Sequence, residues 1–179
     1  MDYAALSRSE QGLSGNAAKF DCASQRRDAV CNHLHGQQVE ASVIRVMVVD
    51  DHEFVRTMMC ELVDGTADMQ VVGEAPDGSQ ALPVAREAKP DVVLMDLSMP
   101  IMNGIDATRE VTASMPEARV IVLTTSTKGQ DVHDAAAAGA VGFLSKGADP
   151  DDVLEAIRAA GNGGTAWDRR SAEILRRAC

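Results

Sequence analysis

Four short apolar runs, spaced regularly along the chain, constrain the fold more than any other feature. They are rich in Val, Ile and Leu, do not alternate with polar residues, and span Val43–Val49, Met69–Glu74, Asp91–Leu97 and Arg119–Thr124. A strand with one face in solvent alternates between apolar and polar residues, so these runs indicate strands covered on both faces. Val141–Ser145 is a fifth, weaker run.

Segments with helical periodicity separate the apolar runs. They cover Glu53–Val63, Ser79–Ala88, Gly104–Ser114, Gln130–Ala138 and Asp149–Ala160. Strands that alternate with helices are joined by right-handed crossovers, which build a parallel sheet with helices on both faces. The sequence therefore predicts an α/β fold.

Turn-forming residues support the boundaries of these helices. Asp64-Gly65 indicates a helix end, and Asp149-Pro150 is typical of an N-cap followed by proline at the first helical position. Pro83 is the misfit, because a proline inside a helix costs about 3 kcal/mol. We therefore expect the helix over Ser79–Ala88 to start late or to bend at Pro83.

The chain divides into three parts. Residues 1–42 are rich in Ser, Gln, Asn, Gly and Ala without a sustained period, which predicts a poorly ordered extension. Residues 43–163 form the predicted domain, and residues 164–179 a linker or short helix. A basic helix over Ala166–Arg177 would link to a further domain, pack on this one, or self-associate. Four residues of the extension are of types that bind metals, Cys22, Cys31, His33 and His35, but they follow no common zinc spacing, so we expect no specific metal site there.

Charge and hydropathy exclude some functions. The formal net charge is −10, and an acidic chain repels phosphate backbones, so we expect no DNA binding by these residues alone. No apolar run approaches the ~20 residues that span a bilayer, and the first residues lack the basic and apolar regions of a secretion signal. We expect a cytoplasmic protein without membrane contact.

Polar residues gather where the predicted strands end. Asp50 and Asp51 follow the first strand, Asp96 lies at the end of the third, Thr124 ends the fourth, and Lys146 follows the fifth. Because the carboxyl ends of parallel strands share one edge of the sheet, we expect these side chains to meet there. Three carboxylates would repel one another, and a divalent cation such as Mg²⁺ relieves that repulsion. A single aspartate after a strand is more often a turn-former or cap, but caps do not explain this whole set.

Several motifs resemble a known family. VMVVDDHEFVR, VVLMDLSMPIMNGIDA, VIVLTTS and GAVGFLSKGADPDDV resemble the receiver domain of bacterial two-component response regulators, and the resemblance covers Ile44–Gly163. VVGEAPDGSQAL and ADPDDVLEAI also resemble the NarL/LuxR-type subfamily, whose receivers usually precede a helix-turn-helix. The resemblance implies a flavodoxin-like (CheY-like) fold with five parallel strands in the order 2-1-3-4-5.

The resemblance also implies the roles of the acidic residues. Asp96 would accept a phosphoryl group from a sensor histidine kinase. Asp51, Asp96 and the backbone carbonyl of Ser98 would bind Mg²⁺, with Mn²⁺ as a substitute, and Asp50 would hold a metal-bound water.

The remaining implied roles belong to three other residues. Lys146 would pair with one phosphoryl oxygen, and the Thr124 hydroxyl would donate to another, although Thr125 is an alternative for that hydroxyl. Phe143 would be the switch aromatic, which turns inward when Thr124 moves. The alternatives are a surface lysine at Lys146 and a core residue at Phe143.

The implied function is a phosphorylation-controlled switch in two-component signalling. Such a chain is not an enzyme beyond its own phosphorylation from small donors and its own dephosphorylation. Its candidate face for docking or homodimerisation would combine Gln130–Ala138, Val141–Ser145 and Asp149–Ala160.

Three alternatives remain at this point. The chain is then the receiver part of a LuxR-type DNA-binding transcription regulator, an aspartate-nucleophile phosphatase, or an interaction module that is not phosphorylated. A phosphatase of that kind wants a second acid two residues after the nucleophile, where this chain has Ser98. The intact set of Asp51, Asp96, Thr124 and Lys146 disfavours the interaction module.

Overall fold

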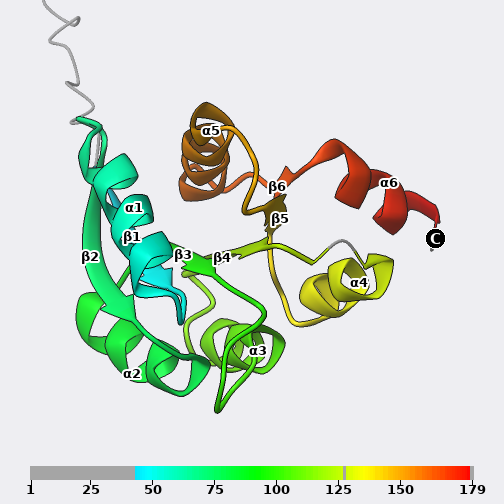
Figure 1. Cartoon of the computed structure of the whole chain (residues 1–179), viewed down its shortest axis with the longest axis horizontal. Helices are drawn as coiled ribbons and strands as arrows, with labels where there is room; N and C mark the ends of the chain where they lie inside the picture. Colours follow the sequence, from blue (N-terminus) through cyan, green and yellow to red (C-terminus); the bar gives the residue numbers. More distant parts are fainter. Residues whose placement is uncertain (1–42, 127, 178–179) are drawn as a thin grey trace, which may run out of the picture. The chain divides into compact units, whose positions relative to one another are not determined.

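The computed structural model describes residues 43–126 and 128–177. Its centre is a parallel six-stranded sheet in the order β2-β1-β3-β4-β5-β6 (Figure 1). The strands are β1 Ile44–Val49, β2 Met69–Ala75, β3 Val92–Met95, β4 Arg119–Thr124, β5 Gly142–Ser145 and β6 Ala166–Trp167. The helices are α1 Glu53–Asp64, α2 Gly78–Ala88, α3 Gly104–Ser114, α4 Gly129–Ala137, α5 Pro150–Gly161 and α6 Arg169–Arg177. The predicted extension over residues 1–42, with its cysteines and histidines, lies outside the described residues.

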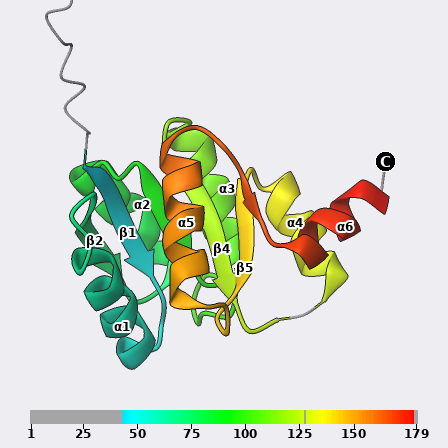
Figure 2. The same cartoon turned by 90° about the horizontal axis from the view of Figure 1, so that it is seen from above.

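Both faces of the sheet are buried, which confirms the meaning of the non-alternating runs. In β1, Val46 and Val48 pack in the core beneath α1 and α5, whereas Met47 and Val49 pack in the core beneath α2 and α3. Figure 2 shows α1 and α5 together on one side of the sheet and α2 and α3 on the other. Successive strand residues point to opposite faces, so a central strand needs apolar residues at every position.

The order 2-1-3-4-5 and the fold class are confirmed, and the structure adds β6 at the edge. Gly142 of β5 pairs with Ala166 of β6. A Cβ at Gly142 would lie 2.7 Å from the carbonyl oxygen of Ala166, so glycine permits this close approach. A strand of two residues carries no periodicity, which is why the sequence did not predict it.

The last helix, α6, packs against α4. Its Ile174 and Leu175 join a cluster formed by Leu97, Val122, Val132, Ala135, Ala140 and Phe143. Figure 1 shows α6 beyond β6, on the same side as α4. The contact places the end of the described chain against α4, beside the β6 edge of the sheet. Asp168 starts α6 by accepting a hydrogen bond from the Ser171 N–H at 2.7 Å.

The start of α2 differs from our expectation. The helix begins at Gly78, where the Asp77 side chain accepts a hydrogen bond from the Ser79 N–H, and it continues through Pro83. The late start was therefore wrong. Pro83 is exposed, and so is Ser79, whose carbonyl loses its helical partner. Water can satisfy that carbonyl, so the proline is tolerated there.

The lengths and polarity of the helices bear on the expectation that the chain does not contact a membrane. Within residues 43–126 and 128–177, each helix is too short or too polar to cross a lipid bilayer.

We predict that Ile174→Ala loosens α6 from α4. The half-buried Ile174 side chain anchors the helix, and its loss should cost about 1 kcal/mol of local stability. Amide hydrogen exchange should accelerate over residues 169–177 and stay unchanged in β3. Glu173→Ala, on the exposed side of α6, is the control; equal acceleration in both variants would contradict the packing role of Ile174.

Candidate functional site

Backbone hydrogen bonds to a neighbouring strand continue one residue beyond the ends of β3 and β5, and they position the site. The Asp96 N–H donates to the carbonyl of Val49 at 2.9 Å, and the Lys146 N–H donates to the carbonyl of Thr124 at 2.9 Å. Both functional residues are therefore held by a neighbouring strand, although each lies just outside its own strand. The first, third, fourth and fifth strands end at the same edge, as predicted.

Lys146 joins two buried carboxylates at this edge. Its Nζ lies 2.6 Å from Asp50 Oδ2 and 2.9 Å from Asp96 Oδ2. The two aspartate side chains are only 4% and 3% exposed. Burial by itself would lower the pKa of the Lys146 ammonium, but hydrogen bonds to Asp50 and Asp96 outweigh it and raise the pKa above its ordinary value.

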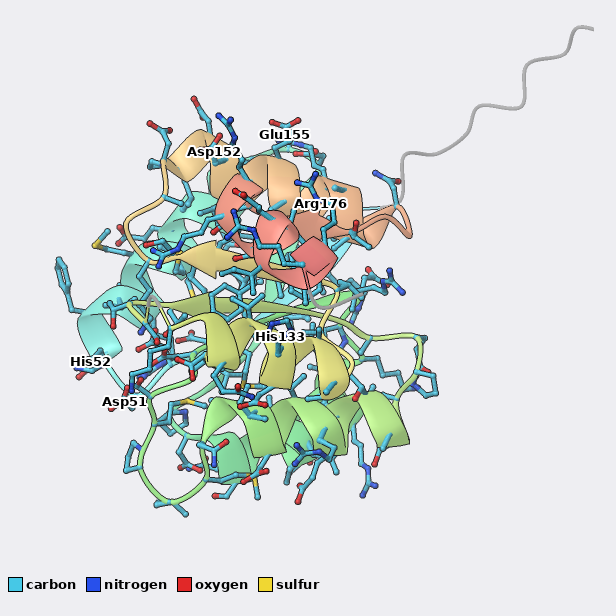
Figure 3. All side chains as sticks on the ribbon, turned by 90° about the vertical axis from the view of Figure 1, so that its right-hand side faces the viewer. Asp51, His52, His133, Asp152, Glu155 and Arg176 are labelled. Atoms are coloured by element: carbon cyan, nitrogen blue, oxygen red, sulfur yellow. The ribbon has the colours of Figure 1, made fainter. Side chains whose placement is uncertain are left out.

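Asp51 and His52 lie on the open side of the cluster. The Asp51 side chain is 23% exposed, and His52 Nδ1 lies 2.9 Å from Asp51 Oδ1. Figure 3 shows the two labelled residues together at one edge of the domain. Ligand atoms of Asp50, Asp51, His52 and Asp96, one from each residue, all lie within 4.8 Å of one another.

The donor set fits a divalent cation. Three carboxylates converge, and the single ammonium of Lys146 balances one of them, which leaves two negative charges. Carboxylate oxygens are the ligands that Mg²⁺ prefers. Without a cation, the repulsion among the carboxylates is only partly relieved.

The two candidate threonines differ in burial. Thr124 is fully buried, and its hydroxyl oxygen accepts a hydrogen bond from the Ser126 N–H at 3.1 Å, whereas Thr125 is exposed. Ser98 is exposed in the loop after β3. With Thr125 and Ser126 it borders an open pocket of about 640 Å³ beside the site.

Phe143 is 4% exposed and packs among apolar residues of β4 and α4. Its carbonyl accepts a hydrogen bond from the Asp168 N–H at 3.2 Å, and it pairs with Trp167 of β6. The side chain points into the domain, and the backbone of the same residue holds the segment that leads to α6.

Two residues that sequence reasoning missed hold the site in shape. Arg56 donates from a guanidinium nitrogen to the carbonyl of Asp50 at 2.8 Å, and its Nε donates to Glu74 Oε2 at 3.3 Å. Gly104, the first residue of α3, approaches Asp96 so closely that a Cβ would lie 1.9 Å from the carbonyl oxygen of Asp96. In the sequence, Gly104 signals only the start of a helix, and Arg56 only a polar position on α1.

The comparison with protein families agrees with this geometry. The model described as "Response regulator receiver domain" matches residues 46–158, more than half of the chain. The chain belongs to the response regulator receiver family. Receiver domains of response regulators are phosphorylated by histidine kinases and bind Mg²⁺ at an acidic pocket. In this chain, Asp50, Asp51, His52 and Asp96 form an acidic cluster with room for a metal ion.

Similar proteins place this receiver near transcription regulators. It is 42% identical to the response regulator GacA of Pseudomonas aeruginosa over 116 residues, which are 65% of this chain and 54% of that protein. It is 40% identical to the transcriptional regulatory protein LiaR of Bacillus subtilis over 121 residues, 68% of this chain and 57% of that protein. The chain thus spans about half the length of these relatives.

A solved structure agrees with the fold. A LuxR-family two-component response regulator from Aurantimonas sp. SI85-9A1 superposes with a TM-score of 0.71 and 34% identity, covering 76% of this chain and 98% of that one. This similar structure is described as a LuxR-family protein, in agreement with the NarL/LuxR-type subfamily that the motifs indicated.

We predict that Gly104→Ala destabilises the receiver by about 3 kcal/mol, because the new Cβ would collide with the Asp96 carbonyl and displace the start of α3. The shift should appear in the urea midpoint of unfolding. Gly129→Ala is the matched control at another helix start, since its Cβ would meet nothing closer than Ile174 at 3.8 Å. A Gly104→Ala variant as stable as this control would show that the contact is not tight.

Proposed function

We propose that this receiver is a phosphorylation-controlled switch in which Asp96 takes a phosphoryl group from a histidine kinase. The observation that carries the proposal is the bridge from Lys146 to Asp50 and Asp96 at the buried sheet edge. The Lys146 ammonium now contacts a carboxylate oxygen of Asp96. It is placed to contact a phosphoryl oxygen in place of that carboxylate oxygen once Asp96 is phosphorylated.

The chemical step needs little beyond alignment and charge balance. A carboxylate oxygen of Asp96 attacks the phosphorus of the donor phosphohistidine. The phosphorus–nitrogen bond breaks, and the histidine nitrogen keeps the electron pair and later takes a proton. The product is an acyl phosphate on Asp96, reactive enough to be hydrolysed afterwards.

The remaining acids would hold the cation. Asp51, Asp96 and the backbone carbonyl of Ser98 would be ligands, and Asp50 would hold a metal-bound water. When bound, Mg²⁺ (or Mn²⁺) neutralises charge that develops on the phosphoryl oxygens. Lys146, whose Nζ lies 2.9 Å from Asp96 Oδ2, supplies a second positive charge.

Thr124 and Phe143 would transmit the change. Thr124 would leave its hydrogen bond with the Ser126 N–H and donate its hydroxyl to a phosphoryl oxygen. Phe143 belongs to the same apolar cluster as Ile174 and pairs with Trp167. A shift of Phe143 would therefore disturb the residues against which α6 packs. The proposed docking or homodimer face of α4, β5 and α5 is partly covered by α6, so a partner there either binds α6 or displaces it.

Exposed apolar residues beside the site offer a place for the donor to dock. Phe54 and Met58 are 75% and 46% exposed and lie one turn apart on α1, which begins directly after His52. Ile101, in the loop after β3, is 86% exposed and has a φ of 68°, a strained value for a β-branched residue. Exposed apolar side chains around a polar site are typical of a protein interface.

For the whole protein we propose transcriptional control. LiaR is a transcriptional regulatory protein, and 121 residues of this chain align with 57% of its length. We propose that the chain does not act as a phosphatase. An aspartate-based phosphatase would need an acid two residues after Asp96, and that residue is Ser98.

We predict that the chain, incubated with Mg²⁺ and acetyl phosphate, gains the mass of one phosphoryl group. Asp96→Asn should abolish the gain, because an amide is not a nucleophile for phosphorus. Asp152→Asn, at an exposed position of α5, should behave as wild type. Intact-mass spectrometry reads both. Phosphorylation that persists in Asp96→Asn would contradict the proposal.

A further inference from the structure

The His52 side chain lies in the acidic site and does not cap the helix that it precedes. It is the N-cap residue of α1, a position where Ser, Thr, Asp or Asn normally satisfies a backbone N–H with its side chain. The His52 side chain makes no such bond. Instead its Nδ1 faces Asp51 Oδ1 at 2.9 Å and Asp50 Oδ1 at 3.6 Å, and its backbone N–H donates to Asp50 Oδ1 at 2.9 Å.

The spacing of these atoms suits a shared metal ion. Two neighbouring ligands of an octahedral ion with bonds of about 2.1 Å lie roughly 3.0 Å apart. His52 Nδ1 and Asp51 Oδ1 are 2.9 Å apart. The whole cluster lies within 4.8 Å, and ligands on opposite sides of one ion are roughly 4.2 Å apart, so a small contraction closes it.

The ring is also free to adjust. The His52 side chain is 67% exposed, whereas Asp50 and Asp96 are buried. Turning the imidazole toward an ion therefore displaces no packed atoms. The Asp51 oxygen that now shares a hydrogen bond with the ring would become its neighbour on the same ion.

We propose that His52 is a metal ligand that shifts the preference of this site from Mg²⁺ toward first-row transition ions. Oxygen ligands suit Mg²⁺, whereas an imidazole nitrogen favours ions such as Co²⁺, Ni²⁺ and Zn²⁺. With Mg²⁺ the ring keeps its hydrogen bond to Asp51. The inference rests on the proposed function, because it requires that Asp51 and Asp96 hold a cation.

The sequence allows a sharp test, because it contains four histidines. A background variant of the full chain with His33→Ala, His35→Ala and His133→Ala leaves His52 as the sole imidazole. His133 lies on α4, away from the acidic cluster (Figure 3), so its removal leaves the site intact. His52→Ala and Asp51→Asn are then introduced separately into this background.

Proton NMR with Co²⁺ reports direct ligation, since ring protons of a bound imidazole shift far outside the diamagnetic range. We expect such signals in the background variant and their loss in His52→Ala and in Asp51→Asn. Calorimetry should show that His52→Ala lowers Co²⁺ affinity about tenfold more than it lowers Mg²⁺ affinity, because with Mg²⁺ the ring is only a hydrogen-bond partner of Asp51.

Two outcomes would overturn the inference, and they are distinguishable. Co²⁺ that binds in an Asp51-dependent way without contact-shifted ring protons would leave His52 as a hydrogen-bond partner of Asp51 only, and the proposed function would stand. Failure of Mg²⁺ and Co²⁺ alike to bind in an Asp51-dependent way would remove the cation site itself, and the proposed function with it.

Discussion

The repulsion among Asp50, Asp51 and Asp96 is the constraint on which the rest of this structure depends. Folding brings their carboxylates to one buried sheet edge, and Lys146 compensates them only in part. A buried charge without a partner is expensive, so these carboxylates need cations or hydrogen-bond donors beside them. The site is therefore built to receive positive charge, and its chemistry follows from that demand.

Packing along β4 and β5 connects this edge to the cluster that supports α6. Thr124 ends β4 with a hydroxyl held by the Ser126 N–H, and Phe143 lies in β5 against the cluster that supports α6. Packed cores resist continuous deformation, so in the switch that we propose a local change at Thr124 would be transmitted as a shift between discrete arrangements. α6 occupies the place where such a shift would be read.

Most of the fold was predictable because its signals are local. β4 and α3 have the predicted bounds, and the pair Asp149-Pro150 starts α5 as expected, with Asp149 accepting from the Asp151 N–H. The late start expected from Pro83 was wrong for a local reason too, since the sequence does not say that this position of α2 faces water. β6 escaped prediction because its pairing depends on the absence of a side chain at Gly142, which is a matter of contact between distant segments.

The candidate site, too, was predictable only in part. The sequence by itself determined which residues end the strands, and therefore that Asp50, Asp51, Asp96, Thr124 and Lys146 share an edge, because parallel strands place their carboxyl ends together. Only the tertiary structure decided the partners: Lys146 between Asp50 and Asp96, Arg56 on the Asp50 carbonyl, and His52 turned to Asp51 instead of capping α1. The physical reason is range. Periodicity and turn chemistry act within a few residues, whereas side-chain direction and burial are settled by atoms that the chain brings together from far apart.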